Sequence, residues 1–465
     1  MNSGTNSNPS KDLTADPKKG FTFSELAGFL LPSGLGLFLF MIPLNYGGNV
    51  TIFVAMVAKF LEQTLSAVLP GLAGLMIGIS ALASLLTYFL KPGWVIHHQF
   101  LNSLLNVGPR WTLVRFLGAV FAGMVLSGSG IEIVYSEKTG AFVLLELLPI
   151  LFCVFLIAGF FLPLLLNFGL IEFFGVLLSK FMRPVFTLPG RSSIDCLASW
   201  VGDGTIGVLL TNKQYEDGYY TKREAAVIGT TFSLVSITFA MVILTQVKLE
   251  HLFPQFYLTV FLAGFIAAII CPRIYPLSKI PDVYIDGSPF QDDRDEVPLS
   301  SGRWSYALRL GVTRAGQNRD LIKTLREGVQ NVFDMWLGVL PTVLCFGTIA
   351  LALAEFTSMF QYLGVPFQPL LELLRVPEAE LVAPTIMLGF ADMFLPSVMV
   401  SSVESEFTRF VVACLSVSQL IYMSEVGSLL LGSKIPVQFK EIFLIYLIRT
   451  LITLPVIVAC AHLIF

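Results

Sequence analysis

Two aspartates stand alone near the centre of long apolar stretches, Asp203 within Arg191–Thr211 and Asp392 within Leu381–Ser402. As one continuous helix, the first stretch would be about 30 Å long, the thickness of the hydrocarbon core of a bilayer. An ionised aspartate facing lipid at that depth costs at least about 2.5 kcal/mol. We therefore expect each carboxylate to face protein or a water-filled cavity, where it could bind a cation, take a proton or hydrogen-bond a polar solute.

Both stretches are interrupted close to the aspartate. Gly202 and Gly204 flank Asp203, and Pro396 follows Asp392. Glycine and proline destabilise a helix, and broken backbone at membrane depth is tolerated only within protein or beside water. The pattern predicts two re-entrant helical hairpins with an aspartate near each tip. The alternative role for each aspartate is to cap the second half-helix of its hairpin, and the two roles can coexist.

Polar residues also mark the apolar segment that follows each hairpin. Glu425 lies about 16 residues into such a segment, with Tyr422 and Gln419 one and two helical turns before it. A carboxylate inside a span is a functional-site candidate, whereas a single hydroxyl is more simply explained by close helix packing. The candidate substrate- or ion-binding residues are Asp203, Asp392, Glu425, Gln419, Thr205, Ser233 and Ser236.

The composition predicts an all-α polytopic membrane protein. The chain is 55% hydrophobic and 13% charged, with a mean hydropathy of +0.77, which lies outside the range of soluble globular proteins. Its six cysteines form no Cys-x-x-Cys pair, and its four histidines suggest no metal site. Because no motif of an enzyme or of a nucleic-acid-binding protein is present, we expect neither catalysis nor a resident cofactor.

Apolar runs divide the chain into about nine transmembrane helices and a repeated core. We expect a disordered tail over 1–25, scaffold helices over 26–140, repeats over 141–273 and 331–465, and a cytoplasmic linker over 274–330. Residues 51–69 fit either a span or an interfacial helix. The predicted spans are Leu26–Tyr46, Pro70–Leu90, Leu113–Ser127, Ala141–Leu166, Ala225–Thr245, Phe253–Cys271, Val332–Phe356, Phe410–Leu431 and Ile442–Ile464.

Basic residues set the expected orientation. Lys18 and Lys19 place the N-terminus in the cytoplasm, and the same rule places the basic linker there. Each repeat crosses the membrane three times, so a linker that does not cross makes the second repeat inverted relative to the first. The two hairpins would then enter from opposite faces of the cell inner membrane and meet at its midplane, where inverted-repeat transporters bind substrate.

One segment carries a resemblance to a known family. Residues 189–239 read PGRSSIDCLASWVGDGTIGVLLTNKQYEDGYYTKREAAVIGTTFSLVSITF. This text resembles the nucleoside-recognition Gate domain of the YjiH-type bacterial inner-membrane proteins. The order of span, interfacial helix, hairpin, span and span, given twice, resembles the core of the concentrative nucleoside transporters. The resemblance covers roughly Phe142–Phe465 and implies a membrane protein that recognises a small solute.

The sequence thus favours a secondary transporter of a small polar solute, nucleoside-like or other, with hairpin gates and Na⁺ or H⁺ as coupling ion. The alternative is a non-transporting membrane sensor or assembly scaffold built on a Gate core. The expected partners are the lipid bilayer and the solute, and a homo-oligomer or a paired membrane partner stays open.

Overall fold

The computed structural model describes residues 21–46, 49–201, 204–232, 235, 237–290, 302–318 and 320–465. Across these ranges nearly every element is a helix, which confirms the all-α polytopic membrane class. Large apolar side chains such as Leu82 (61% exposed) cover the outer surface, as expected for contact with lipid. Seven helices in the described ranges are long and apolar enough to cross a membrane: Phe23–Met41, Leu69–Leu90, Pro109–Ser127, Phe142–Leu166, Glu250–Lys279, Leu321–Phe356 and Phe439–Ile464.

The N-terminal part differs from its prediction at the end of the first span. Helix α1 stops at Met41, and two short antiparallel strands follow, paired from Pro43↔Ile52 to Tyr46↔Asn49. Helix α2 has only 13 residues, about 20 Å, which is too short to span a bilayer. The elements of this part are α1 (Phe23–Met41), β1 (Pro43–Tyr46), β2 (Asn49–Ile52), α2 (Phe53–Leu65), α3 (Leu69–Leu90), α4 (Gly93–Ile96), α5 (Gln99–Leu105), α6 (Pro109–Ser127) and α7 (Glu132–Tyr135).

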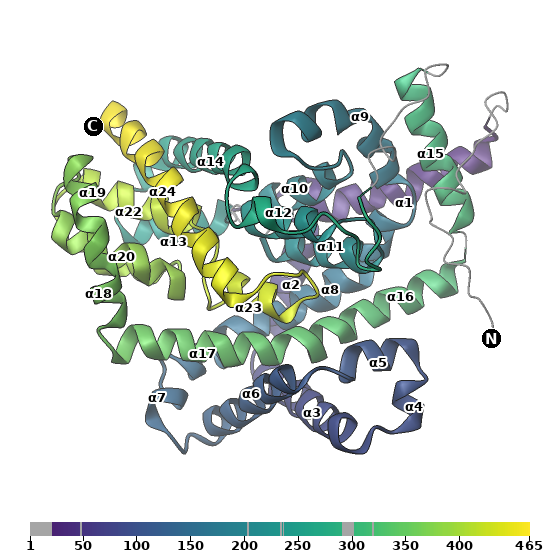
Figure 1. Cartoon of the computed structure of the whole chain (residues 1–465), viewed down its shortest axis with the longest axis horizontal. Helices are drawn as coiled ribbons and strands as arrows, with labels where there is room; N and C mark the ends of the chain where they lie inside the picture. Colours follow the sequence, from purple (N-terminus) through teal and green to yellow (C-terminus); the bar gives the residue numbers. More distant parts are fainter. Residues whose placement is uncertain are drawn as a thin grey trace.

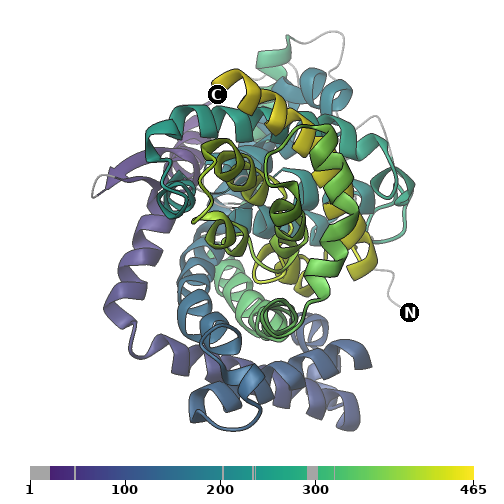
Figure 2. The same ribbon diagram turned by 90° about the vertical axis from the view of Figure 1, so that its left-hand side faces the viewer.

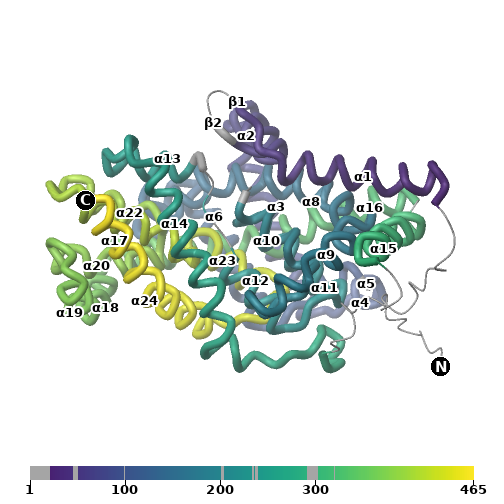
Figure 3. The backbone as a smooth tube through the Cα atoms, turned by 90° about the horizontal axis from the view of Figure 1, so that it is seen from above, coloured from purple at the N-terminus to yellow at the C-terminus, as the bar shows by residue number. Residues whose placement is uncertain are grey.

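A long helical rod crosses the molecule between α3 to α7 on one side and the other helices, α1 and α2 included, on the other side (Figure 1). It consists of α16 (Leu321–Asp334), a π-helical turn η6 (Met335–Val339) and α17 (Leu340–Phe356). In Figure 1 it runs horizontally, with α3 to α7 below it and the interrupted helices above. Figure 2 shows the same rod nearly end-on, and Figure 3 shows α1 along the outer edge.

The two halves of the core present the same order of elements. Each begins with a π-helical turn just before a Leu-Pro pair, Leu148-Pro149 in the first half and Leu340-Pro341 in the second. The first half continues as η1 (Phe142–Leu147), α8 (Leu148–Leu166), α9 (Leu170–Phe186), α10 (Ser192–Val201), α11 (Gly204–Glu216), α12 (Lys222–Thr231), α13 (Ile237–Gln246), η2 (Glu250–Leu252) and α14 (Phe253–Ile270). After α17 the second half continues as α18 (Met359–Gly364), η7 (Val365–Phe367), α19 (Gln368–Leu373), α20 (Ala379–Ala391), α21 (Leu395–Val400), α22 (Glu406–Ser418), α23 (Val426–Gly432) and α24 (Phe439–Ile464).

Two segments predicted as single spans, Ala225–Thr245 and Phe410–Leu431, are each divided into two helices. The first is divided into α12 and α13, and the second into α22 and α23. In the second segment, Leu420 adopts the left-handed backbone conformation at φ +64°, which ends the helix. The backbone N–H groups of Met423 and Ser424 then donate to the carbonyl oxygens of Phe390 and Ala391. The backbone freed by the break is therefore satisfied by the neighbouring α20.

Helices of the two halves pack reciprocally. In the first half, α10 packs against α11, and in the second, α20 packs against α21. These pairs also contact the opposite half. Helix α11 packs on α23 of the second half, and α21 packs on α13 of the first half. The centre of the protein is therefore built from both halves together.

The stretch 274–330 contains ordered helix. After the 3₁₀ turns η3 (Cys271–Arg273) and η4 (Leu277–Lys279), helix α15 (Arg303–Gln317) packs on α9 and α1, and most of α16 follows. Gly169, at φ +88°, lies so close to α15 that a β-carbon there would collide with the carbonyl oxygen of Gly311. This stretch is therefore tied to the base of the first half.

Candidate functional site

Glu425 joins the two halves at the centre of the protein. It lies at the N-terminus of α23, and its Oε1 accepts a hydrogen bond of 2.8 Å from Thr205 Oγ1, at the start of α11. Its Oε2 accepts a bond of 3.3 Å from the hydroxyl of Tyr422. A carboxylate is favoured at a helix N-terminus, where the free N–H groups carry partial positive charge. This contact thus joins residues of the two halves that lie 220 positions apart in the sequence.

Asp392 has two roles in the structure. Its Oδ1 accepts from the backbone N–H groups of Phe394 (2.7 Å) and Leu395 (3.3 Å), so it caps the turn that opens α21. Its Oδ2 accepts a 2.7 Å bond from the hydroxyl of Ser424, the residue before Glu425. The capping role expected for this aspartate is therefore present. Its second oxygen is bonded to the break between α22 and α23, the segment that also contains Glu425.

Gln419 lies at the start of the break and connects α22 to two neighbouring helices. Its Nε2 donates to the carbonyl oxygen of Ile386 on α20 and to Thr450 Oγ1 on α24, both at 3.0 Å. Its Oε1 is packed so closely over Gly389 that a β-carbon there would collide with it. This glycine thus allows α20 to approach the interrupted segment.

The predicted residues fall into two groups. Thr205, Gln419 and Asp392 are buried around the break, and Thr205 is bonded to Glu425. Asp203, Ser233 and Ser236 lie outside the described residues. Nearby hydroxyls have local roles, because Thr230 and Thr231 donate to the carbonyl oxygens of Ala226 and Val227 in their own helix.

Arg449 is a buried charge that the sequence reading missed. It lies ten residues after the first residue of α24, about 15 Å along the helix axis, and has no exposed surface. Its Nε donates to the carbonyl oxygen of Ser418 (2.6 Å) and its Nη1 to that of Thr231 (3.1 Å). An arginine in the middle of an apolar segment was the available signal, because such residues mark functional sites.

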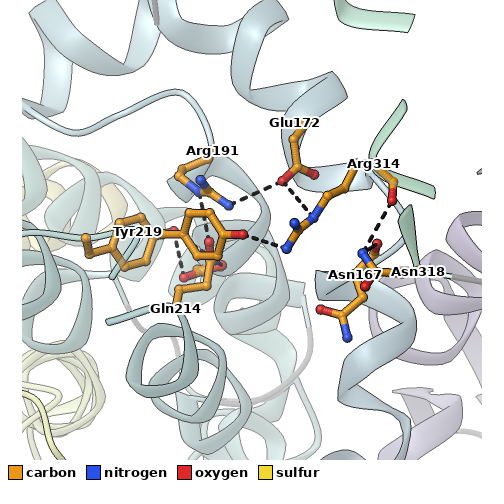
Figure 4. A network of polar contacts seen from close by, with 9 residues as sticks. Asn167, Glu172, Arg191, Gln214, Tyr219, Arg314 and Asn318 are labelled. Atoms are coloured by element: carbon orange, nitrogen blue, oxygen red, sulfur yellow. Dashed lines mark hydrogen bonds and ion pairs between the residues drawn. The ribbon is translucent and has the colours of Figure 1, made fainter. Parts of the chain in front are cut away.

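A polar network secures the base of the α10–α11 pair (Figure 4). The guanidinium of Arg191 donates to Gln214 Oε1 (2.9 Å), lies 3.8 Å from the ring centre of Tyr219 and faces Glu172 of α9. From α15, Arg314 donates to the hydroxyl of Tyr219 (2.6 Å). Burial raises the pKa of Tyr219, although Arg191 and Arg314 oppose this shift. The network ties α9, α10, α11 and α15 together.

Asp195 connects the two arms of the same pair. Its Oδ1 accepts from Gln214 Nε2 (2.6 Å), and its Oδ2 accepts from the hydroxyls of Tyr220 (2.9 Å) and Thr211 (3.3 Å). The aspartate is fully buried. Three donors converge on one carboxylate, so the arms can separate only if this charge loses its partners.

We expect Asp195→Asn to destabilise the protein, because the amide keeps only one acceptor oxygen for three donors. Hydrogen bonds to a charged group contribute about 1.5–3 kcal/mol each, so the melting temperature should fall clearly. The matched control is Asp217→Asn, which alters a half-exposed i,i+4 pair with Lys213 worth about 1 kcal/mol or less. Thermal unfolding in detergent measures both, and equal melting temperatures for the two variants would contradict this role for Asp195.

A cavity of about 820 Å³ opens beside the ends of α11 and α23. Its lining is rich in charge and includes Lys213, Glu216, Arg326, Asp334 and Lys434. Burial and the neighbouring carboxylate of Asp334 raise the pKa of Glu216 above its usual range. The cavity is therefore polar, and it lies at the opposite ends of α11 and α23 from Thr205 and Glu425.

The site chemistry is that of hydrogen-bond acceptors and protonatable carboxylates. Asp392 and Glu425 can accept from the hydroxyl or N–H groups of a polar solute, or take up a proton. Within the described ranges, no group of three or more histidine, cysteine, aspartate or glutamate side chains is placed to hold a metal ion.

Two sequence comparisons relate the chain to known proteins. The sequence model of the Gate family, described as nucleoside recognition, matches residues 148–250, from α8 through α13. The chain is also 49% identical over 437 residues to the uncharacterized protein BpOF4_10220 of Alkalihalophilus pseudofirmus, and the match covers 94% of each chain. The protein therefore belongs to the Gate-domain, nucleoside-recognition family of membrane proteins.

Proposed function

We propose that the protein is a secondary transporter that moves a small polar solute, nucleoside-like in chemistry, by coupling to a cation gradient. The observation that carries the proposal is the hydrogen bond from Thr205 to Glu425, which joins the interrupted helices of the two halves. Transporters with inverted repeats bind their substrates where such broken helices meet. Asp392 and Glu425 would accept hydrogen bonds from the solute or carry the coupling ion.

In this proposal the α10–α11 and α20–α21 pairs are re-entrant hairpins that act as gates. The two repeats are 141–273 and 331–465, inverted relative to each other, with the stretch 274–330 on the cytoplasmic side. Support comes from the repeated order of elements and from the reciprocal packing of α11 on α23 and of α13 on α21. A gate that rests on the other half can open only when the two halves change their packing.

The 820 Å³ cavity would be the cytoplasmic vestibule of the pathway. Helix α11 leads from Thr205 at the break to Lys213 at the cavity, eight residues or about 12 Å away. Helix α23 follows directly on Glu425 and is followed by Lys434, which also lines the cavity. Two packed helices therefore separate the carboxylates from the vestibule, which is the arrangement expected of a closed inner gate.

Uptake into proteoliposomes tests the proposed function. The purified chain would be assayed with a panel of radiolabelled nucleosides, bases and organic acids, with Na⁺ and H⁺ gradients applied separately. We expect gradient-driven accumulation of at least one nucleoside-like solute. If a solute raises the melting temperature of the protein but is never transported, the chain is a sensor with a Gate core.

The proposed topology predicts which loops react from outside the cell. Single cysteines at Glu137 and Glu404 should react with an impermeant thiol reagent in whole cells, whereas those at Asp217 and Asp286 should not. All four positions are exposed, while five of the six native cysteines are buried and Cys460 is partly buried, so the unmodified chain gives the background. Labelling of Asp286 and Glu404 from the same side would contradict the inverted repeats.

A further inference from the structure

Both divided segments end their first helix at the side chain of Arg449. Ser418 is the last residue of α22 and Thr231 is the last residue of α12, and their carbonyl oxygens are the two acceptors of the Arg449 guanidinium. The third nitrogen, Nη2, has no hydrogen-bond partner among the described residues. One side chain therefore satisfies a helix end from each half of the protein.

The charges at this point are balanced. The C-terminal end of a helix carries about −0.5 of an elementary charge from its unpaired carbonyl groups. Two such ends together carry about −1, which a single guanidinium neutralises. The planar fork of arginine can also serve two acceptors in different directions, which suits it to this position.

Neighbouring bonds hold the arginine in place. Beside Arg449 in α24, Thr450 Oγ1 accepts the 3.0 Å bond from Gln419, and one turn earlier the hydroxyl of Tyr446 donates to the carbonyl oxygen of Ile386. These contacts fix α24 against α20 and the second break. The bonds of Tyr446 and Thr450 therefore hold the guanidinium in a fixed position at the junction of α12 and α22.

We propose that Arg449 is a built-in cation that occupies the place of a coupling Na⁺ between the two divided helices. In ion-coupled transporters, half-helix C-termini and unwound carbonyl groups are the ligands that hold Na⁺. Here the guanidinium already neutralises those groups, so no alkali ion is held at the junction. Only the identity of the coupling ion rests on the proposed function. With the place of Na⁺ filled by Arg449, that ion is a proton carried by the carboxylates of Asp392 and Glu425.

The first test separates the charge of Arg449 from its volume. Arg449→Lys keeps the positive charge, whereas Arg449→Met keeps a long unbranched side chain without charge. We expect the methionine variant to melt well below the lysine variant, because it leaves two helix ends without a cation. Equal melting temperatures for the two variants would overturn the proposal.

The second test replaces the missing cation from solution. In Arg449→Ala, millimolar guanidinium chloride, far below denaturing concentrations, should restore a measurable part of the lost melting temperature relative to choline chloride. The control is Thr450→Val, which loses the bond to Gln419 but keeps the arginine, and which should show no such gain. Absence of recovery in Arg449→Ala, or equal recovery in Thr450→Val, would overturn the proposal.

A third measurement addresses the coupling ion. The melting temperature of the unmodified protein should be the same in sodium and choline chloride, and its uptake should persist without Na⁺. A requirement for Na⁺ would overturn the assignment of the proton. The melting experiments need no transported solute, so failure of the transport assay alone would count against the proposed function and leave the role of Arg449 to be decided by its variants.

Discussion

Replacing Glu425 by glutamine is expected to abolish gradient-driven uptake while leaving the fold intact. Glutamine keeps the length of the side chain and one acceptor oxygen, so the bond from Thr205 can persist. It loses the negative charge, and a hydrogen bond to a charged group contributes about 1.5–3 kcal/mol, or about 10- to 100-fold in affinity. Uptake by proteoliposomes should fall by at least this factor, and the melting temperature should fall less than in Asp195→Asn, because the new amide group can donate to the hydroxyl of Tyr422.

The matched control for this variant is Glu404→Gln, which removes an exposed carboxylate shortly before α22. It should transport at the normal rate. Thr205→Val removes the hydroxyl that bonds to Glu425 and keeps the shape, so it should reduce uptake without removing the carboxylate. Full uptake in Glu425→Gln would show that the carboxylate between the halves has no role in transport.

Changing Asp392 to asparagine and to alanine is expected to distinguish its capping role from a role in transport. Asparagine keeps the oxygen that caps Phe394 and Leu395, so Asp392→Asn should melt close to the unmodified protein. Alanine loses the cap, at a cost of about 0.5–2 kcal/mol, so Asp392→Ala should melt lower. If the charge of Asp392 serves transport, uptake falls in both variants.

The same pair of substitutions at Asp203 asks whether both halves contribute. We expect Asp203→Asn to lose gradient-driven uptake without a large change in stability. Normal transport by both asparagine variants, together with misfolding of both alanine variants, would show that the aspartates are structural caps only. Loss of uptake in Asp203→Asn alone would place the ion site in the first half.

The interrupted stretches around Asp203 and Asp392 were accessible from sequence because polar residues, glycine and proline are conspicuous in apolar text. The same contrast identified Glu425 as a candidate. Its partner was not accessible, because Thr205 lies 220 residues away and only the packing of α11 on α23 brings the two together. Sequence patterns report local chemistry, whereas such a contact depends on how distant helices pack.

The division of the predicted span Phe410–Leu431 into two helices could not be predicted from hydropathy. The break begins at Leu420, a residue that normally favours helix, and it is stabilised by backbone bonds to Phe390 and Ala391. These acceptors lie in another helix, so tertiary hydrogen bonds override local preference here. A hydropathy profile contains no information on such bonds.

Two other features had signals that the sequence reading did not use. Pro43 and Asn45, followed by Gly47 and Gly48, form a turn-rich run after α1, which is typical of a β-hairpin. Arg449 lies well inside an apolar helix, where an unpaired charge is costly. Its significance depends on the two helix ends that it caps, and these became visible only with the breaks themselves.

Solute counterflow tests the central claim, that the chain carries a solute through the junction of its two halves, most directly. Proteoliposomes loaded with an unlabelled nucleoside-like solute are diluted into a trace of the same solute in labelled form, with no ion gradient. A transporter should accumulate the label transiently above equilibrium, and substitution of Glu425 should change this exchange if the carboxylate binds the solute. Specific binding of the solute without any counterflow by the unmodified protein would contradict the account.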